Sequence, residues 1–326
     1  MHIVITGGAG FIGSHLAEAF LDDGAGVTAV DDLSTGARKN IEHLRENPRF
    51  DLVIENVANE GVLDHLVRDA DAVCHLAAAV GVRLIVEDPV RTIETNILGT
   101  EVALKVAARY GARLFIASSS EVYGKNDALP FAEDSDMVLG PTTHSRWCYA
   151  CSKAIDEFLA LAYHRERGLP VVIGRFFNTV GPRQTGQYGM VVPRFVQQAL
   201  AGDPITVYGD GEQTRCFCHV SDVVAAVSRL MFEPKAEGGI FNIGSDEGIT
   251  INRLAEKVKT ITGSSSDIIH VPYEEAYEEG FEDMRSRQPD VSRVKDLVGF
   301  EVTRDVDQII RDVVEHFRQQ SSVPRR

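Results

Sequence analysis

The chain has few cysteines and no long apolar run, and each shortage restricts the class of protein. Its five cysteines are spread over 326 residues, which is not the dense framework of a small secreted domain. The first residues run directly into an apolar segment, 2–6, without the pattern of a signal peptide. No apolar run reaches the roughly 18 residues of a membrane span. We therefore expect a cytoplasmic protein with no membrane partner.

Positive charge is also scarce. The sequence has 33 Lys and Arg against 48 Asp and Glu, which gives a formal net charge of -15. Because nucleic acids and anionic membranes require a basic surface, we expect no nucleic-acid partner. The content of 44% hydrophobic and 25% charged residues is typical of a globular protein. The length is enough for one large domain or two ordinary ones.

The cysteine spacing does not favour a metal site. Cys148 and Cys151 form a C-x-x-C pair, but the other close pair, Cys216 and Cys218, has only one residue between its members. Paired C-x-x-C ligands are the usual pattern of a structural zinc site. We therefore interpret these cysteines as reduced structural thiols and expect no bound metal.

A glycine-rich turn follows the first apolar segment. Segment 2–6 is predicted to be a strand, and a helical pattern begins at Ser14 and continues to Asp23. A turn of this composition between a first strand and a first helix is typical of a dinucleotide phosphate site, where the helix N-terminus faces the pyrophosphate. The residues of the turn expected to hold the cofactor are Gly7, Gly10, Phe11, Ile12 and Gly13.

A second predicted strand, 26–30, ends in two acidic residues, Asp31 and Asp32. A carboxylate at this place can accept hydrogen bonds from the adenosine ribose hydroxyls, and its charge would repel a 2′-phosphate. The first arginine after the pair is Arg38. The pattern therefore favours NAD over NADP as the cofactor.

Three further predicted strands, 50–54, 72–79 and 113–117, are separated by helical patterns, including one over 92–108. Ligands of an open parallel sheet bind at the carboxyl ends of its strands. The last of these strands leads into the hydroxyl-rich run 118–124. The additional residues that we expect at the cofactor are Asn56, Val57, Ala77, Ala78 and Asn96.

The alternation of strand and helix predicts an α/β fold with a Rossmann-type, doubly wound parallel sheet. We assign residues 1–178 to an NAD-binding domain, with a return segment at about 216–244. Most of 179–326 is expected to form a smaller α/β domain that binds the substrate.

Tyr149 and Lys153 are four residues apart in a segment predicted to be helical, so they share a face of the helix. A nearby ammonium favours phenolate over phenol, and we expect it to lower the pKa of Tyr149 toward the range of a general base. Such a tyrosine can remove a proton from an alcohol while hydride leaves the carbinol carbon.

The order of these motifs resembles that of the extended short-chain dehydrogenase/reductases, which include NAD-dependent epimerases, dehydratases and decarboxylases of nucleotide sugars. The resemblance extends over nearly the whole chain. It is carried by the glycine turn 7–13, Asp31, the run 75–78, the run 118–124, Tyr149 with Lys153, and the segment 175–183.

The resemblance implies a role for individual residues. Ser119 would bind the reacting sugar hydroxyl, Tyr149 would be the base, and Lys153 would tune it and hold the nicotinamide ribose. Arg215 and Arg287 would clamp the diphosphate. The expected substrate-binding residues are Ser119, Ser120, Asn178, Val192, Val207, Tyr208, Arg215 and Arg287, with Val207 and Tyr208 flanking the uracil of a UDP-sugar.

Three chemistries occur in this family. Dehydratases need an Asp where this chain has Ser120, which disfavours dehydration. The run 119–121 with its Glu121, a catalytic candidate that could also be only a hydrogen-bonded strand-end carboxylate, resembles UDP-glucuronate decarboxylases, as do Trp147 and the run 215–217. Segment 178–184 and the loop 186–192 are more similar to bacterial 4-epimerases. We therefore expect an isomerase that epimerises a UDP-hexose, UDP-glucose or UDP-glucuronate, at C4, with decarboxylation as the alternative.

Two other expectations concern activity and assembly. A catalytically idle NAD-binding scaffold is the remaining alternative, although such proteins usually lose the Tyr or the Lys that this chain keeps. In the family, helices corresponding to 92–109 and 146–167 often pair across a two-fold axis as a four-helix bundle. The resemblance thus implies a homodimer, with Leu159, Ala162 and Tyr163 as candidate contacts.

Overall fold

A large parallel sheet organises the protein. The computed structural model describes residues 1–81, 88–186, 190–276 and 284–322. Within these ranges, seven strands form one sheet in the order β11-β6-β5-β4-β1-β2-β3, and every neighbouring pair is parallel. The strands are β1 (His2–Thr6), β2 (Gly26–Val30), β3 (Phe50–Val53), β4 (Ala72–His75), β5 (Arg113–Ser119), β6 (Val171–Phe176) and β11 (Gly239–Ile243). The predicted doubly wound sheet is confirmed.

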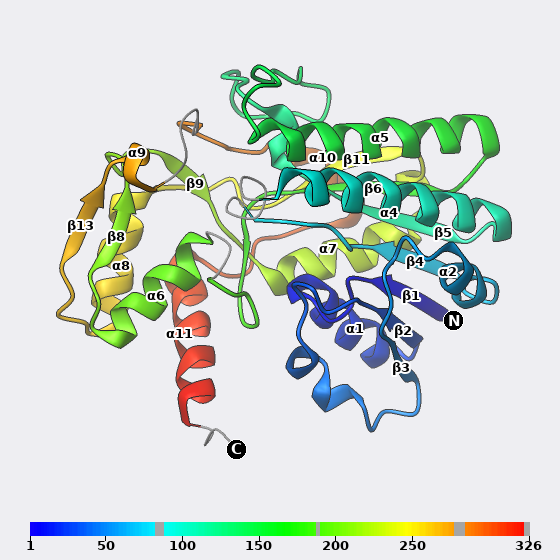
Figure 1. Cartoon of the computed structure of the whole chain (residues 1–326), viewed down its shortest axis with the longest axis horizontal. Helices are drawn as coiled ribbons and strands as arrows, with labels where there is room; N and C mark the ends of the chain where they lie inside the picture. The colour runs from blue at the N-terminus through cyan, green and yellow to red at the C-terminus, as the bar shows by residue number, and fades with distance from the viewer. Residues whose placement is uncertain (82–87, 187–189, 277–283, 323–326) are drawn as a thin grey trace.

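Helices cover both faces of this sheet (Figure 1). On one face, α1 (Phe11–Asp22) packs against α7 (Val220–Phe232), and α10 (Ser292–Val298) lies beside α7. On the other face, α2 (Glu60–Val67), α4 (Pro89–Tyr110) and α5 (Trp147–Arg167) pack in sequence. Strands buried on both faces have the near-continuous apolar composition seen in His2–Thr6 and Val171–Phe176.

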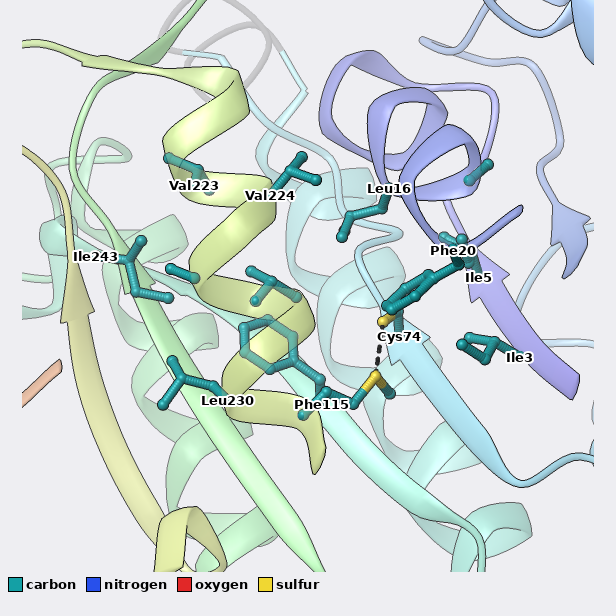
Figure 2. Packing of buried hydrophobic residues seen from close by; sticks show 14 of the residues in the cluster. Ile3, Ile5, Leu16, Phe20, Cys74, Phe115, Val223, Val224, Leu230 and Ile243 are labelled. Atoms are coloured by element: carbon teal, nitrogen blue, oxygen red, sulfur yellow. Dashed lines mark hydrogen bonds between the residues drawn. The ribbon is translucent and has the colours of Figure 1, made fainter. Parts of the chain in front are cut away.

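The core between the sheet, α1 and α7 holds these layers together. Figure 2 shows Leu16 of α1 and Val224 of α7 pointing toward one another, with Phe20 of α1 above Ile5 of β1. The Cys74 thiol lies in the same layer and contacts Met231, with 3.3 Å between the sulfur atoms. All five cysteines are free, and burial raises the pKa values of Cys74, Cys216 and Cys218.

A smaller α/β region lies beside the carboxyl edge of the sheet (Figure 1). It consists of α6 (Val191–Ala201), β8 (Ile205–Tyr208), α8 (Ile251–Thr262), β13 (Ile268–Val271), α9 (Tyr273–Ala276) and α11 (Val306–Ser322). Its own core joins α6, α8 and α11. The short strands β7 (Thr179–Val180) and β10 (Cys218–His219) pair with each other where the chain passes between the two regions.

The two strands within 205–216 do not pair with each other. β8 pairs in parallel with β13, and β9 (Thr214–Cys216) pairs antiparallel with β12 (Gly248–Thr250). Both partners come from later in the chain, where no local pattern indicates the pairing.

The strand order reverses between β1 and β4, because the chain first adds β2 and β3 on one side and then β4, β5 and β6 on the other. Such a reversal opens a crevice at the carboxyl ends of the central strands. The strand β11 adjoins β6 and brings 239–243 back to the large sheet. The division into 1–178 with a return segment and 179–326 stays a proposal.

Candidate active site

A large cavity of about 1130 Å³ lies at the carboxyl ends of the central strands. It extends from the glycine turn after β1 to residues of the smaller region, so the same cavity can hold two ligands next to each other. The predicted site residues that line it are Gly7, Gly10, Phe11, Ile12, Gly13, Asp31, Asp32, Asn56, Val57, Ala77, Ala78, Ser119, Ser120, Glu121, Tyr149, Lys153, Asn178, Val192, Tyr208, Arg215 and Arg287.

The turn after β1 is built for close backbone approach. Gly7 has a φ of 69°, which side chains disfavour. A Cβ on Gly13 would lie 2.2 Å from the Gly7 carbonyl oxygen, so only glycine lets α1 begin this close to the turn. The N-terminus of α1 therefore faces the cavity, which is the geometry that binds a pyrophosphate. The residues of the turn fit a dinucleotide.

The acidic pair after β2 lines the same end of the cavity. Asp31 accepts hydrogen bonds from the backbone N–H groups of Ala9 at 2.9 Å and Leu33 at 2.8 Å. Burial raises the pKa of Asp31, and these hydrogen bonds oppose the effect. Asp32 accepts from the Asn56 amide at 3.0 Å. The carboxylates are thus held in place where a ribose would lie.

Asn96 does not line the cavity, contrary to the expectation. It is fully buried, its side-chain oxygen accepts from the Ala79 N–H at 2.8 Å, and its amide donates to Ser152 at 3.1 Å. Ala79 itself lines the cavity. Asn96 therefore supports the cavity wall from behind, because the inward face of α4 packs on the sheet rather than on the ligand space.

Tyr149 and Lys153 reach the cavity from the first turns of α5. The phenol is 6% exposed, and Ser119 lies beside it. The expected decrease in the pKa of Tyr149 is wrong for this structure: burial raises the pKa, and the charges of Glu121 and Asp156 add to the increase. The Lys153 ammonium donates to Asp156, with 3.1 Å between Nζ and Oδ2.

Glu121 lies near the phenol, in the 3-10 turn Ser120–Tyr123. Its carboxylate accepts from Arg287 and from Arg146, the latter at 3.3 Å. Burial alone would raise the pKa of Glu121, but the charges of Arg287, Arg146 and Arg215 lower it to about 2. The group is therefore a carboxylate at neutral pH, surrounded by guanidinium groups that bring more positive charge than it carries.

Val207 is the second predicted residue that the structure places elsewhere. Strand β8 alternates buried and partly exposed residues, and Val207 is fully buried in the core of the smaller region. Tyr208, its neighbour, points the other way and lines the cavity. Asn178 also lines it and donates to the Cys216 carbonyl at 3.1 Å.

Sequence reasoning missed four arginines of the cavity wall, Arg91, Arg146, Arg183 and Arg194. Arg146 lies three residues before Tyr149, on the same helical face, and this spacing is the signal that could have found it. Arg183 donates to Glu18 of α1, and its backbone N–H donates to His316 of α11 at 3.0 Å. It thereby links α1 to the smaller region. No pattern in the sequence indicates this contact.

His75 is buried between β1 and α4, where it hydrogen-bonds Thr6 and Thr100. Among the residues that the structure describes, no cluster of His, Cys, Asp or Glu could hold a metal ion. No helix within the described ranges is long and apolar enough to cross a membrane. Residues 187–189 of the loop that pointed to 4-epimerases lie outside the described residues.

One cavity combines the glycine turn for a dinucleotide, the residues Ser119, Tyr149 and Lys153, and several arginines. This combination defines the class of NAD-dependent enzymes that convert nucleotide sugars. The chain belongs to the GDP-mannose 4,6 dehydratase family, whose model matches residues 4–313. This result confirms the resemblance to the short-chain dehydrogenase/reductases and their nucleotide-sugar enzymes.

Three known proteins illustrate the similarity. The UDP-N-acetyl-alpha-D-glucosaminuronate decarboxylase of Bacillus cytotoxicus is 43% identical over 97% of both chains. UDP-glucuronic acid decarboxylase 1 of Xenopus tropicalis is 36% identical over 98% of this chain and 72% of its own length. The crystal structure of UDP-glucuronic acid 4-epimerase from Bacillus cereus, in complex with UDP-glucuronic acid and NAD, is 28% identical, with a TM-score of 0.89 over 98% of this chain and 100% of that one.

These similarities correct one expectation and support another. The assignment as an isomerase is wrong, because the relatives at 43% and 36% identity are decarboxylases, whereas the 4-epimerase is less similar. NAD as the cofactor is confirmed at the level of the family.

Proposed function

We propose that this protein decarboxylates a UDP-linked hexuronic acid and releases a UDP-linked pentose. The observation that carries the proposal is the cluster around Glu121. Arg146 and Arg287 both contact its carboxylate, and Arg215 adds its charge. A cavity end with three guanidinium groups and one carboxylate suits a ligand that brings several negative charges, which a diphosphate and a sugar carboxylate together provide.

The reaction begins at C4 of the sugar. Tyr149 lies beside Ser119, so a sugar hydroxyl placed between them can lose its proton to the phenolate. Bound NAD would accept the C4 hydride and later return it. The residues that would hold it are those of the turn 7–13 together with Asp31, Lys153 and the wall at Ala77–Ala79.

Oxidation at C4 makes the sugar carboxylate a β-keto acid. The bond between C5 and C6 then breaks, CO2 leaves, and the electron pair passes to the C4 oxygen as an enolate. The Tyr149 hydroxyl and Ser119 would stabilise this oxyanion by hydrogen bonding. C5 takes up one proton, hydride returns to C4, and Tyr149 returns its proton to the C4 oxygen. The sum is the loss of CO2 and the uptake of one proton, with no net oxidation.

The arginine cluster would orient the carboxylate for this cleavage. Arg287 is 7% exposed and lines the cavity, and its partner Glu121 is held from the other side by Arg146. A substrate carboxylate can therefore share Arg287 without leaving Glu121 unpaired. Because the pKa of Glu121 is about 2, we assign it to positioning these arginines and not to proton donation.

The substrate named for the relative at 43% identity carries an N-acetyl group, whereas the substrate named for the relative at 36% identity does not. The higher identity supports an acetamido group at C2 of the hexuronate. The test is to incubate the purified protein with UDP-N-acetylglucosaminuronate and, separately, UDP-glucuronate, and to follow products by mass and sugar NMR. We expect a product lighter by one CO2. A C4 epimer of unchanged mass from both substrates would contradict the proposal.

We also propose that the protein is a homodimer. Helices α4 and α5 lie side by side (Figure 1) and expose apolar side chains at helical spacing. Phe158 is 61% exposed and Leu98 is 48% exposed, and Val90, Ile93 and Ile155 are exposed as well. Leu159 and Tyr163 are instead partly buried against the chain's own core. We therefore expect the contacts of α5 at exposed residues such as Phe158, one position before the predicted Leu159.

A further inference from the structure

The last helix of the chain, α11, reaches the cavity of the candidate active site. Its residues His316, Phe317 and Gln320 line the cavity, as the glycine turn does from the other region. None of the three takes part in the chemistry described above. Helix α11 shares the core of the smaller region with α6 and α8, so it contributes to the cavity wall from outside the large sheet.

The loop that follows β2 places the end of α11 beside the dinucleotide turn. The Ala37 N–H and the Asn40 side-chain amide both donate to the carbonyl of Ala9, within the glycine turn, at 3.0 and 2.9 Å. Lys39, from the same loop, lines the cavity. Burial and then the charge of Lys39 lower the pKa of His316. The loop thus contacts the glycine turn on one side and lies close to α11 on the other.

Arg183 connects α11 to the start of α1. Its guanidinium donates twice to the Glu18 carboxylate, at 3.0 and 2.5 Å, and once to the Ser14 hydroxyl at 3.3 Å. Its backbone N–H donates to Nε2 of His316 at 3.0 Å. Ser14 lies in the first turn of α1, the end of the helix that faces a bound pyrophosphate. One residue therefore ties the end of α11 to the helix terminus that would hold the cofactor.

The backbone of Arg183 has a conformation that depends on these contacts. Its φ is 71°, in the left-handed region that residues with a side chain disfavour. Such a conformation persists only where the surrounding structure fixes it, and it occurs preferentially at ligand sites. The bonds to Glu18, Ser14 and His316 are the contacts that fix it here.

His316 takes part in this connection as an acceptor. Its Nε2 atom accepts from the Arg183 N–H and from the Gln320 amide, the latter at 2.7 Å. A ring nitrogen can accept only when it carries no proton, so the contact requires a neutral imidazole. Any side chain with an acceptor atom at the same reach could replace it, and a side chain without one could not.

We propose that α11 completes the NAD site, and that Arg183 and His316 hold this helix against the dinucleotide part of the cavity so that the cofactor is retained between turnovers. The proposal requires NAD to be the cofactor, as it is in the family, but it does not require a particular sugar nucleotide. Retention suits the proposed reaction, because the hydride returns to the sugar and no exchange of NAD with the solution is needed.

The consequence is that NAD leaves the protein only when α11 moves away from α1. Loss of the acceptor at His316 leaves the Arg183 N–H without its partner and removes one of the contacts that fix its backbone. The glycine turn and Asp31 remain in place, so NAD should still bind. We therefore expect the dissociation rate of NAD to increase.

The test measures the release of NAD directly. Protein loaded with radiolabelled NAD is mixed with excess unlabelled NAD, without sugar nucleotide, and the label that remains on the protein is followed by rapid filtration. We expect His316→Ala to release NAD at least about tenfold faster than the wild type, as for the loss of one hydrogen bond that leaves its donor unpaired. Arg183→Gly, in which glycine tolerates the positive φ, is the second variant and should also release NAD faster.

Two matched variants separate this contact from a general effect on the helix. His316→Gln keeps a side-chain acceptor and should release NAD at a rate close to that of the wild type. Glu315→Ala changes the preceding residue, which accepts from Gln319 at 3.1 Å and is absent from the lining of the cavity. It should also match the wild type.

Folding of each variant is checked by circular dichroism. Folded His316→Ala or Arg183→Gly protein that releases NAD at the wild-type rate would overturn the proposal, and so would His316→Gln or Glu315→Ala protein that releases it as fast as His316→Ala. Because no turnover is measured, these results are independent of the decarboxylation assay.

Discussion

At the scale of single residues, the decisive feature is which charged groups pair with each other. These pairs differ from those that the sequence indicates. Tyr149 and Lys153 have the expected helical spacing, but Lys153 is paired with Asp156 and not with the phenol. Glu121, which could have been only a strand-end carboxylate, is surrounded by arginines from positions 146, 215 and 287. The chemistry of the site follows from these pairings.

The first prediction concerns Tyr149. Tyr149→Phe removes the hydroxyl and keeps the buried ring, so we expect turnover of the UDP-hexuronate to be lost while NAD remains bound. General acid–base groups contribute about 10²–10⁴-fold to rate, and the loss should be at least of that order. Turnover is measured by CO2 release and NAD by its absorbance after gel filtration. Turnover at the wild-type rate would remove Tyr149 from its assigned role.

The second prediction concerns Arg287. Its guanidinium is buried against Glu121, and losing one partner of a buried ion pair costs about 3–5 kcal/mol. We expect Arg287→Gln to raise KM and lower kcat for the hexuronate, together by at least about tenfold in kcat/KM.

The matched control for Arg287 is Arg285→Gln, two residues earlier. The Arg285 side chain is 75% exposed and pairs with Asp210, which is 54% exposed. Exposed pairs of this kind contribute little, so the kinetics should be unchanged. Equal effects of the two substitutions would show that the site does not depend on Arg287.

At the scale of elements, the sequence predicted the strands of the large sheet and the helices between them within a few residues. Strand β1 was expected at 2–6 and is His2–Thr6, and the helix expected over 92–108 is Pro89–Tyr110. The apolar runs and the glycine turn carry this information locally. The sequence predicted no partners for β8 and β9, because their partners β13 and β12 follow later in the chain.

The third prediction concerns the start of α1. A Cβ at Gly13 would lie 2.2 Å from the Gly7 carbonyl oxygen, which is backbone and cannot move away cheaply. We expect Gly13→Ala to abolish NAD binding and to lower the thermal stability.

Gly61→Ala is its control, because that helical glycine has only the Asn59 side chain nearby, at 3.6 Å. It should bind NAD normally and be equally or more stable, by up to about 1 kcal/mol. Binding is measured by calorimetry and stability by thermal unfolding. Normal NAD binding by Gly13→Ala would contradict the role of the glycine turn as the pyrophosphate-binding site.

At the scale of the whole molecule, the two regions meet around one cavity, and contacts between distant segments close it. Arg183 joins Glu18 of α1 and His316 of α11, so the cofactor helix and the last helix of the chain are tied together. Helices α4 and α5 carry exposed apolar residues, among them Leu98 and Phe158, on the opposite side of the sheet from α1 (Figure 1).

The fourth prediction concerns assembly. We expect the wild type to sediment at twice the 35.7 kDa of one chain. Burial of exposed apolar residues such as Phe158 and Leu98 against a second chain would stabilise the dimer. Phe158→Glu places a charge in that stripe and should give the single-chain mass. Ile269→Glu, at a 40% exposed position on β13, should leave the dimer intact. A wild type that sediments as one chain would refute the dimer.

The sequence by itself determined the sheet, the glycine turn with Asp31, and the helical face that carries Tyr149 and Lys153, because each depends on spacing within a short segment. Only the tertiary structure decided that Asn96 and Val207 lie outside the cavity, that Arg146 lies inside it, and that Asp156 takes the ammonium of Lys153. These outcomes depend on burial and on contacts between elements far apart in the chain.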